Sequence, residues 1–264
     1  MRSLSVCIAT YNNSDTIKRA LDSINSLADE IVVLDSQSTD GTREIVNEYH
    51  EAVIYDYEFK GFADMFRTAA EKASNEWVLF VDADEEVKEA LAHEIRVTLD
   101  EPSDDAYRAE KQNRMWGQWM HATHKPRPIL ARKQALSWDD SLVGEEWKVR
   151  DGFTSDELRN PIHHYAYDDI DEYLEKWTRY TAADALDECK AGYTPSIPKY
   201  YIKGIAAFWY RYIYEKAILD GWQGLFFATM SGVFYPVVDA KIRHIQTIQK
   251  QNEDWEEWWI DTKL

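Results

Sequence analysis

The first hundred residues alternate short apolar runs with segments whose apolar residues recur at helical spacing. Four runs predict strands: Leu4–Thr10, Glu30–Leu34, Ala52–Tyr57 and Trp77–Val81. Helices are predicted between them at Ile17–Ile24, with Ser14 and Asp15 as N-cap, at Arg43–Tyr49 and at Phe62–Ala73. Strands and helices that alternate at this spacing favour an α/β fold with a mostly parallel sheet, flanking helices and right-handed crossovers.

Beyond residue 100 the pattern is less regular. Strands are predicted at Tyr107–Trp119 and Arg127–Ala131, and helices at Asp168–Leu186 and Ile202–Leu219. Gly221–Val238 is the longest stretch without a charged residue, but its glycines and Pro236 favour a buried or interfacial hairpin over a membrane span. We therefore expect an α/β domain over residues 1–165 and a helical, aromatic-rich extension over residues 166–264.

Charge and cysteine usage narrow the classes of partner. The net charge of −18 argues against a nucleic-acid partner, because phosphates would be repelled. The stretch from Lys199 to Lys250 is an exception, with seven Lys or Arg residues against three Asp or Glu. Two distant cysteines, and an N-terminus without the apolar length of a signal peptide, indicate a reduced, cytoplasmic protein. Cys7 is expected to be buried in the first strand.

Three polar clusters follow predicted strands: Thr10-Tyr11-Asn12, Asp35–Asp40 and Asp82–Glu86. Ligands bind beyond the carboxyl ends of parallel strands, so these clusters should converge on one crevice. Asp82 and Asp84, one residue apart, offer oxygen ligands to Mn²⁺ or Mg²⁺, which can bridge to a diphosphate. The competing interpretation is an acidic loop that caps the next helix; the position after the fourth strand favours the metal.

Three blocks resemble glycosyltransferase family 2 in their order and spacing: Ser5–Asn12, Glu30–Thr42 and Trp77–Glu85. In the second half, His164-Tyr165-Ala166-Tyr167 and Ile218–Gly224 resemble the branch that includes lipopolysaccharide inner-core glucosyltransferases. The resemblance implies a GT-A (Rossmann-like) fold and an inverting transfer from a nucleotide-sugar donor. It covers nearly the whole chain and is weakest between about residues 100 and 140.

The resemblance also implies a donor site. Its residues would be Thr10, Tyr11 and Asn12 at the nucleotide end, Asp35 at the base or ribose, Arg67 near the diphosphate, and Asp82 and Ala83 of the Asp-x-Asp motif. Ser36 stands where many relatives have a second aspartate, which leaves the base open. For Arg67 the competing interpretation is an ordinary surface arginine.

Metal ligation and catalysis are assigned through the same resemblance. Asp84 would ligate the metal directly, Asp82 would face the ribose or a metal-bound water, and His164 would complete the metal or diphosphate site. A histidine that only packs on a neighbouring tyrosine is the alternative. The general base is expected in Gly144-Glu145-Glu146-Trp147, where one alignment favours Glu145 and another Glu146. The alternative for either residue is a solvent-exposed acid that caps a helix and has no catalytic role.

Aromatic residues crowd between Phe208 and Tyr235, within the basic stretch. They indicate either a packed core or a platform on a membrane surface, where Lys203, Arg211, Lys216, Lys241 and Arg243 would meet anionic headgroups. Near the end of the chain, Trp255, Trp258 and Trp259 suggest a dimer contact and hence a homo-oligomer.

Together these features predict a metal-dependent hexosyltransferase of cell-envelope polysaccharide biosynthesis. It would use a nucleotide-sugar donor and a glycan or lipid-linked acceptor, in the cytoplasm or peripherally at the inner face of the membrane. Two alternatives stay open: a non-catalytic nucleotide-sugar or carbohydrate-binding module on the same fold, and glycosylation of a modified nucleic-acid base. The intact Asp82, Asp84 and Glu145-Glu146 favour catalysis. Nucleotidyl transfer is disfavoured, because Tyr11-Asn12-Asn13 replaces a Gly-rich basic loop.

Overall fold

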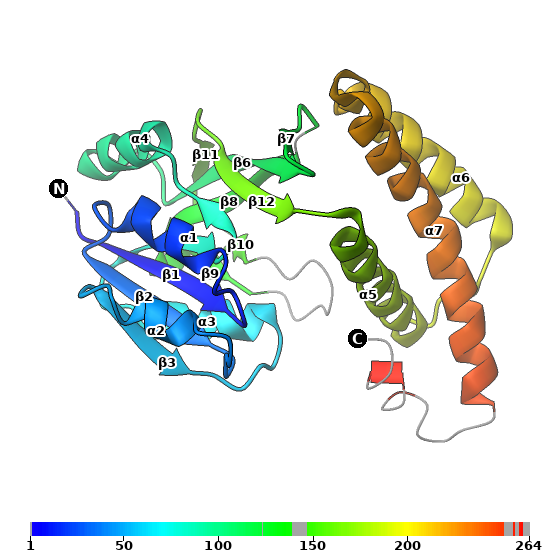
Figure 1. Cartoon of the computed structure of the whole chain (residues 1–264), viewed down its shortest axis with the longest axis horizontal. Helices are drawn as coiled ribbons and strands as arrows, with labels where there is room; N and C mark the ends of the chain where they lie inside the picture. The colour runs from blue at the N-terminus through cyan, green and yellow to red at the C-terminus, as the bar shows by residue number, and fades with distance from the viewer. Residues whose placement is uncertain (1, 123, 139–146, 251–255, 257–258, 261–264) are drawn as a thin grey trace. The chain divides into compact units, whose positions relative to one another are not determined.

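The structure, a computed structural model, describes residues 2–122, 124–138, 147–250, 256 and 259–260. These residues form two compact units (Figure 1). The first, which we call the sheet unit, comprises residues 2–113, 124–138 and 147–166. The second, the helical unit, comprises residues 114–122 and the described residues from 167 onward.

Four parallel strands form one half of the main sheet, in the order β3-β2-β1-β4. They are β1 (Leu4–Thr10), β2 (Glu30–Asp35), β3 (Ala52–Asp56) and β4 (Trp77–Asp82). β1 is central in this half and is buried along nearly its whole length, with Cys7 fully buried as predicted. The predicted α/β fold is confirmed, because these are the four runs that the apolar pattern identifies as strands.

Beyond β4 the sheet continues with β8 (His124–Arg132), β6 (Ala106–Met115), β12 (Ile162–Tyr167) and β5 (Glu85–Glu86). β8 is antiparallel to both β4 and β6, and β12 is antiparallel to β5. Two short strands, β7 (Gln118–Trp119) and β11 (Ser155–Glu157), pair with β6. β9 (Leu136–Ser137) and β10 (Lys148–Val149) form a separate two-stranded sheet. The strand predicted over Tyr107–Trp119 is broken at Trp116 and Gly117, whose positive φ angles make a hairpin turn.

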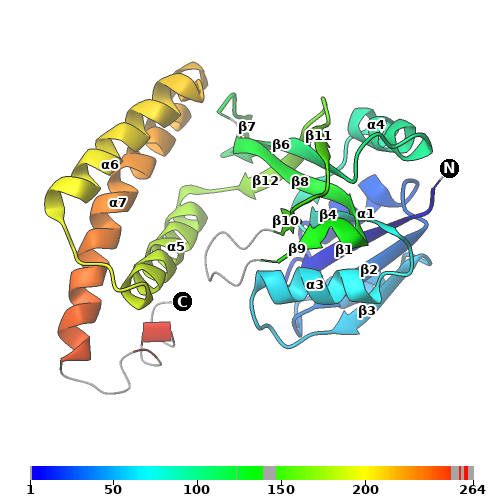
Figure 2. The ribbon, with the colours of Figure 1, turned by 180° about the vertical axis from the view of Figure 1, so that it is seen from behind.

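Helices cover both faces of the sheet. α1 (Ile17–Ile24), α2 (Thr42–Val46) and α4 (Glu89–Asp100) pack on one face, and α3 (Phe62–Lys72) packs on the other (Figure 2). Successive residues of β4 show this directly, because Leu79 packs with the first group and Phe80 with Phe66 of α3. Two apolar layers therefore bury the parallel strands and leave their carboxyl ends to the polar loops.

The start of α1 differs from the prediction that Ser14 and Asp15 cap it. The helix begins at Ile17, and Thr16 occupies the N-cap position without a side-chain cap hydrogen bond. The backbone N–H groups of Thr16 and Ile17 donate instead to the carbonyl of Asn13, and the N–H of Ser14 donates to Asp40. The polar residues after β1 thus connect loops rather than cap the helix.

The helical unit is built from α5 (Ile170–Lys190), α6 (Ile197–Trp209) and α7 (Gly221–Gln249). A π-helical turn, η2 (Tyr210–Tyr214), and a 3₁₀ turn, η3 (Ala217–Asp220), connect α6 to α7. α7 packs along both α5 and α6 (Figure 1). The helix predicted over Ile202–Leu219 therefore ends early, and the break includes Lys216, whose φ is 63°.

The hairpin predicted within Gly221–Val238 is wrong, because α7 is one continuous helix. Gly224 and Gly232 act as small residues at close contacts, with Ala217 and with Gly204 and Phe208 respectively, while Gly221, with φ of 63°, forms the turn that leads into the helix. Gly232 lies where α6 comes closest: a Cβ atom added at Gly204 of α6 would stand 2.3 Å from the carbonyl oxygen of Gly232. Pro236 lies inside the helix, close to the same contact.

Trp259 belongs to the core of the helical unit. Its side chain is 1% exposed and its indole N–H donates to the carbonyl of Ala182 at 3.1 Å. The prediction that it forms a dimer contact is therefore wrong, because this apolar surface is used within the chain. Trp255 and Trp258 lie outside the described residues.

Replacing Gly204 by alanine tests the close approach of α6 and α7. In an isolated helix the change would stabilise by about 1 kcal/mol. Because the added methyl group has no space beside Gly232, we expect a net loss of about 2 kcal/mol. Urea unfolding followed by circular dichroism measures this loss of stability. Ala206→Gly, at an exposed position of the same helix, measures the contribution of helix propensity alone. A Gly204→Ala protein at least as stable as the wild type would contradict the packing.

Candidate active site

The carboxyl ends of β1, β2 and β4 are level with one another. Thr10 of β1 pairs with Asp35 of β2, and Ala9 of β1 pairs with Asp82 of β4. The structure therefore brings the three predicted polar clusters to one edge of the sheet, as expected for ligand binding in an open α/β fold.

Two of the predicted nucleotide-end residues hold the loops of β1 and β2 together. Asn12, with φ of 51°, donates its backbone N–H to Ser38 Oγ at 2.8 Å and accepts from the N–H of Thr39 at 2.9 Å. Thr10 is buried, and its carbonyl accepts from the N–H of Ser36. Tyr11, between them, keeps 61% of its surface exposed. Of the three, Tyr11 is the side chain most open to a ligand.

Asp35 is almost fully buried at this edge. Its Oδ2 accepts from Arg43 at 2.7 Å and from the N–H of Ser38 at 3.1 Å. Its Oδ1 is buried and has no hydrogen-bond partner in the described part of the chain. A buried acceptor without a donor costs free energy, which an N–H or O–H group of a ligand would offset. The sequence reasoning missed Arg43, although its place in the helix after β2 is a usable signal.

A group of four charged side chains, the buried charge cluster, surrounds the start of the acidic loop. It consists of Asp82, Glu85, Lys111 of β6 and Arg127 of β8. Glu85 is fully buried and lies 2.7 Å from Lys111 Nζ and 2.5 Å from Arg127 Nη2, while its second oxygen accepts from the N–H of Asp82. Asp82 lies farther from the cations, at 3.2 Å from Lys111 and 3.3 Å from Arg127.

The electrostatics of this cluster favour the charged forms of Glu85 and Lys111. Burial alone would raise the pKa of Glu85, but Arg127 and Lys111 hold that pKa well below its usual range. Burial alone would lower the pKa of Lys111, but Glu85 is the main influence that raises it. The sequence reasoning missed Lys111 and Arg127, and it included Glu85 only as a member of the polar cluster Asp82–Glu86. Lys111 within one predicted strand and Arg127 at the start of another were the available signals.

Asp84 and His164 face each other next to the cluster. Asp84 Oδ2 lies 3.3 Å from His164 Nε2, and His164 Nδ1 lies 2.8 Å from Asn113 Oδ1. Burial would raise the pKa of Asp84, but His164 holds it below its usual value. Asn113 Oδ1 can only accept a hydrogen bond, so Nδ1 is the donor of this pair and Nε2 is the ring nitrogen that faces the carboxylate. A carboxylate oxygen and a ring nitrogen, both of which can ligate a metal ion, therefore lie at one place.

The described residues contain no ready-made group of three or more His, Cys, Asp or Glu ligands. Asp84 and His164 are a pair, and a pair suits Mn²⁺ or Mg²⁺, which keep waters and take their remaining ligands from substrate phosphates. Asp82 is less suited to direct ligation, because Lys111 and Arg127 already neutralise it. The donor set therefore fits a cation that is completed by a diphosphate.

The remaining predicted residues are placed less favourably or are not described. The methyl group of Ala83 is buried in the core beneath α1 and α4, so only its backbone is available to a ligand. Arg67 forms an ion pair with Asp64 of its own helix, and its contact with a diphosphate stays a prediction. Glu145 and Glu146 lie outside the described residues.

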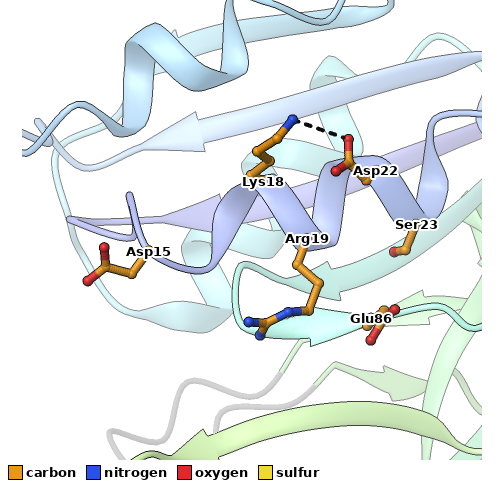
Figure 3. Close-up of a pocket in the computed structure, with 6 residues that line it drawn as sticks. All are labelled: Asp15, Lys18, Arg19, Asp22, Ser23 and Glu86. Atoms are coloured by element: carbon orange, nitrogen blue, oxygen red, sulfur yellow. Dashed lines mark ion pairs between the residues drawn. The ribbon is translucent and has the colours of Figure 1, made fainter.

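A hollow of about 500 Å³ lies elsewhere on the sheet unit, between α1 and β5 (Figure 3). Its lining is polar: Asp15, Lys18, Arg19, Asp22, Ser23 and Glu86. The hollow is open to solvent, and Arg19 stacks over the ring of Tyr165 beside it. None of the predicted site residues lines it, so we place the candidate active site at the strand ends and not in this hollow.

Comparison with known proteins identifies the family. Residues 5–153, more than half of the chain, match the glycosyl transferase family 2 model. The chain belongs to glycosyl transferase family 2. It is therefore a glycosyltransferase, and the match includes β1, β2, β4 and the acidic loop.

Its relatives include bacterial proteins that are named as glycosyltransferases. It is 26% identical over 246 residues to the lipopolysaccharide core biosynthesis glycosyltransferase LpsC of Rhizobium meliloti, covering 90% of both chains. An uncharacterized glycosyltransferase of Rickettsia prowazekii is 29% identical over 207 residues, covering 73% of this chain and 70% of the relative.

Solved structures with a related arrangement include S. aureus TarS, with a TM-score of 0.49 and 19% identity over 70% of this chain. This chain spans 40% of the length of that TarS chain. Glucosyl-3-phosphoglycerate synthase from Mycobacterium tuberculosis has a TM-score of 0.35 and 23% identity, covering 44% of both chains. That structure is a complex with Mn²⁺, uridine diphosphate and phosphoglyceric acid.

Glu85→Gln tests the buried charge cluster of this glycosyltransferase. The change leaves Lys111 and Arg127 buried without their main counter-charge, and we expect a loss of about 3 kcal/mol in unfolding free energy. The urea midpoint at neutral pH measures it. Glu110→Gln, the same change at an exposed position of β6, should lie within about 0.5 kcal/mol of the wild type. Equal stability of the two variants would show that the cluster does not hold the loop.

Proposed function

We propose that this family 2 glycosyltransferase moves a sugar, with inversion, from a nucleotide-diphosphate donor to a hydroxyl group of a glycan or lipid-linked acceptor. The observation that carries the proposal is the facing pair of Asp84 and His164, 3.3 Å apart, at the sheet edge where β1, β2 and β4 end. Two groups that could ligate a metal ion at the carboxyl ends of these strands would suit the diphosphate of a nucleotide-sugar donor.

Asp35 and Tyr11 would recognise the nucleoside. The partnerless Oδ1 of Asp35 would accept from the base or ribose, and the exposed ring of Tyr11 offers a surface for the base. Thr10 and Asn12 would shape the edge through the loop hydrogen bonds that they make. The diphosphate would lie toward Asp84, with Arg67 as a further candidate contact.

Asp84 and His164 would hold Mn²⁺ or Mg²⁺, and Asp82 would face the ribose or a metal-bound water. A cation held there supplies positive charge against the leaving nucleoside diphosphate. Asn113 would keep the His164 imidazole in the tautomer whose Nε2 is an electron-pair donor. The cations of the buried charge cluster would keep Asp82 turned away from direct ligation.

Glu145 or Glu146 would take the proton from the acceptor hydroxyl. Support comes from the residue that follows them: Trp147 is buried, and its ring centroid lies 5.2 Å from that of Phe80 on β4. The chain next to the two glutamates is therefore anchored beside the strand that ends in Asp82.

The acceptor class rests on the relatives. The name of LpsC refers to lipopolysaccharide core biosynthesis, and the similarity covers 90% of both chains. This supports a glycan or lipid-linked acceptor of the cell envelope. The enzyme would act in the cytoplasm, with peripheral contact at the inner face of the membrane.

Nucleotide titration tests the donor and metal assignment. We expect calorimetry to detect binding of one of UDP, GDP, CDP and dTDP in the presence of Mn²⁺, and at least a tenfold weaker binding without it, since the cation bridges protein and diphosphate. Asp84→Ala should abolish the metal-dependent part, whereas Asp151→Ala, at an exposed turn, should bind as the wild type does. If the folded protein binds none of the four nucleotides, the donor-site assignment is wrong, and a carbohydrate-binding module is favoured instead.

Glu145→Gln and Glu146→Gln separate the two base candidates. The variant that lacks the base should lose about 10²-fold or more in turnover, because proton removal contributes on that scale. Its nucleotide affinity should be unchanged. Release of the nucleoside diphosphate, measured with the donor whose nucleotide binds and an envelope glycan extract, reports turnover. Full activity in both variants would exclude this segment as the source of the base.

A further inference from the structure

The connection between α6 and α7 carries an unusual set of exposed apolar side chains. We call residues 209–222, from the end of α6 through η2 and η3 to the start of α7, the hairpin tip (Figure 1). Its large apolar residues are 42–72% exposed: Trp209, Tyr210, Ile213, Tyr214, Ile218, Leu219 and Trp222. Packing within the helical unit therefore leaves much of their surface uncovered.

The exposed surface continues along one side of α6. Tyr201 and Ile205 precede Trp209 at intervals of four residues, and Ile202 lies beside them; these three are 53–65% exposed. Isolated exposed apolar residues are ordinary, but a continuous patch that spans a helix and its connecting turns marks an interaction surface. The aromatic residues of this segment are therefore divided: Tyr200 and Phe227 are buried, others are half-buried, and five are exposed, namely Tyr201, Trp209, Tyr210, Tyr214 and Trp222.

Within residues 199–222, the charged side chains that are exposed to solvent are all lysines, although Asp184 of α5 lies near Lys203. Lys199, Lys203 and Lys216 are exposed. The acidic residues of this stretch are occupied: Glu215 pairs with Arg211, and Asp220, 1% exposed, accepts from the backbone of His121 and Ala122. A chain with a net charge of −18 thus presents an apolar surface rimmed only by lysines within residues 199–222.

The exposed apolar surface and the lysines around it together favour one kind of partner. Two copies meeting through the same surface would bring identical lysines together, which is unfavourable. An anionic membrane satisfies both features: tryptophan and tyrosine rings prefer the interface between headgroups and acyl chains, and lysines attract anionic headgroups.

The segment Ala217–Gln249 is the one helical stretch among the described residues that is long and apolar enough to cross a membrane. Its inner part, however, supplies Val238, Ile242 and Ile245 to the core of the helical unit. Contact at the tip is therefore favoured over a crossing.

We propose that the hairpin tip docks into the interface of a membrane that contains anionic phospholipids, with Trp209, Tyr214 and their neighbours inserted between headgroups. Lys203 and Lys216 contact the headgroup phosphates. The tip shares no residue with the donor site, so this binding goes beyond the proposed transfer and does not depend on it. It would hold the enzyme at a surface where lipid-linked molecules are presented.

Vesicle flotation with the full chain tests the proposal. The wild type should float with vesicles of phosphatidylcholine containing phosphatidylglycerol, and at least tenfold less with phosphatidylcholine alone. Trp209→Ser/Tyr214→Ser should lose at least tenfold in binding to the anionic vesicles. The matched control, Val97→Ser/Tyr180→Ser, removes two exposed apolar residues elsewhere and should bind as the wild type does.

Charge reversal tests the headgroup contact. Lys216→Glu should weaken binding by roughly fivefold or more, from the energy of one lysine near an anionic surface. Lys60→Glu, at another exposed lysine, should change it less than twofold. Circular dichroism confirms folding of every variant.

Three results would overturn the proposal: no flotation of the wild type, equal losses in the control pair, or sedimentation showing a dimer that Trp209→Ser/Tyr214→Ser dissociates. Nucleotide titration of the same samples reports the donor site separately, so that failure of one site is not mistaken for failure of the other.

Discussion

The fully buried carboxylate of Glu85 and its ion pairs hold together the strands at the candidate active site of this glycosyltransferase. Glu85 has no exposed surface, and a buried charge is tolerated only when it is paired. Lys111 and Arg127 supply that pairing and tie the loop after β4 to β6 and β8. The backbone of Glu85 also pairs with His164 of β12, which brings that histidine to Asp84. One residue, through its side chain and its backbone, thus connects three strands to the acidic loop.

The same cluster gives the two aspartates of the loop different surroundings. Asp82 has two cations within 3.3 Å, whereas the described neighbour of Asp84 is a histidine whose other nitrogen is bound to Asn113. A divalent cation gains most beside a carboxylate that no fixed positive charge already neutralises. The electrostatics therefore support Asp84 as the direct ligand, a distinction that the spacing of the motif cannot make.

The helical unit uses apolar residues in two ways. Where α6 and α7 meet at Gly204 and Gly232, the absence of side chains lets the backbones approach, and the core around Val238 and Trp259 is closed. At the hairpin tip, equally apolar side chains remain exposed beside lysines. Composition is the same in both places; the direction in which each residue points differs, because η2 and η3 turn the chain.

The sequence by itself determined that strands and helices alternate, that four strands are parallel and that three polar clusters lie at one edge of the sheet. The spacing of apolar residues is a local property of each segment, and parallel strands place their carboxyl ends together. It also indicated Asp84 and His164. Only the tertiary structure decided that Lys111, Arg127 and Asn113 join them, that Gly224 and Gly232 of α7 serve packing rather than a turn, and which aromatics are exposed. These features depend on contacts between residues far apart in the chain. A buried charge or a close helix contact does not alter the spacing of apolar residues in its own segment, so the sequence pattern does not reveal it.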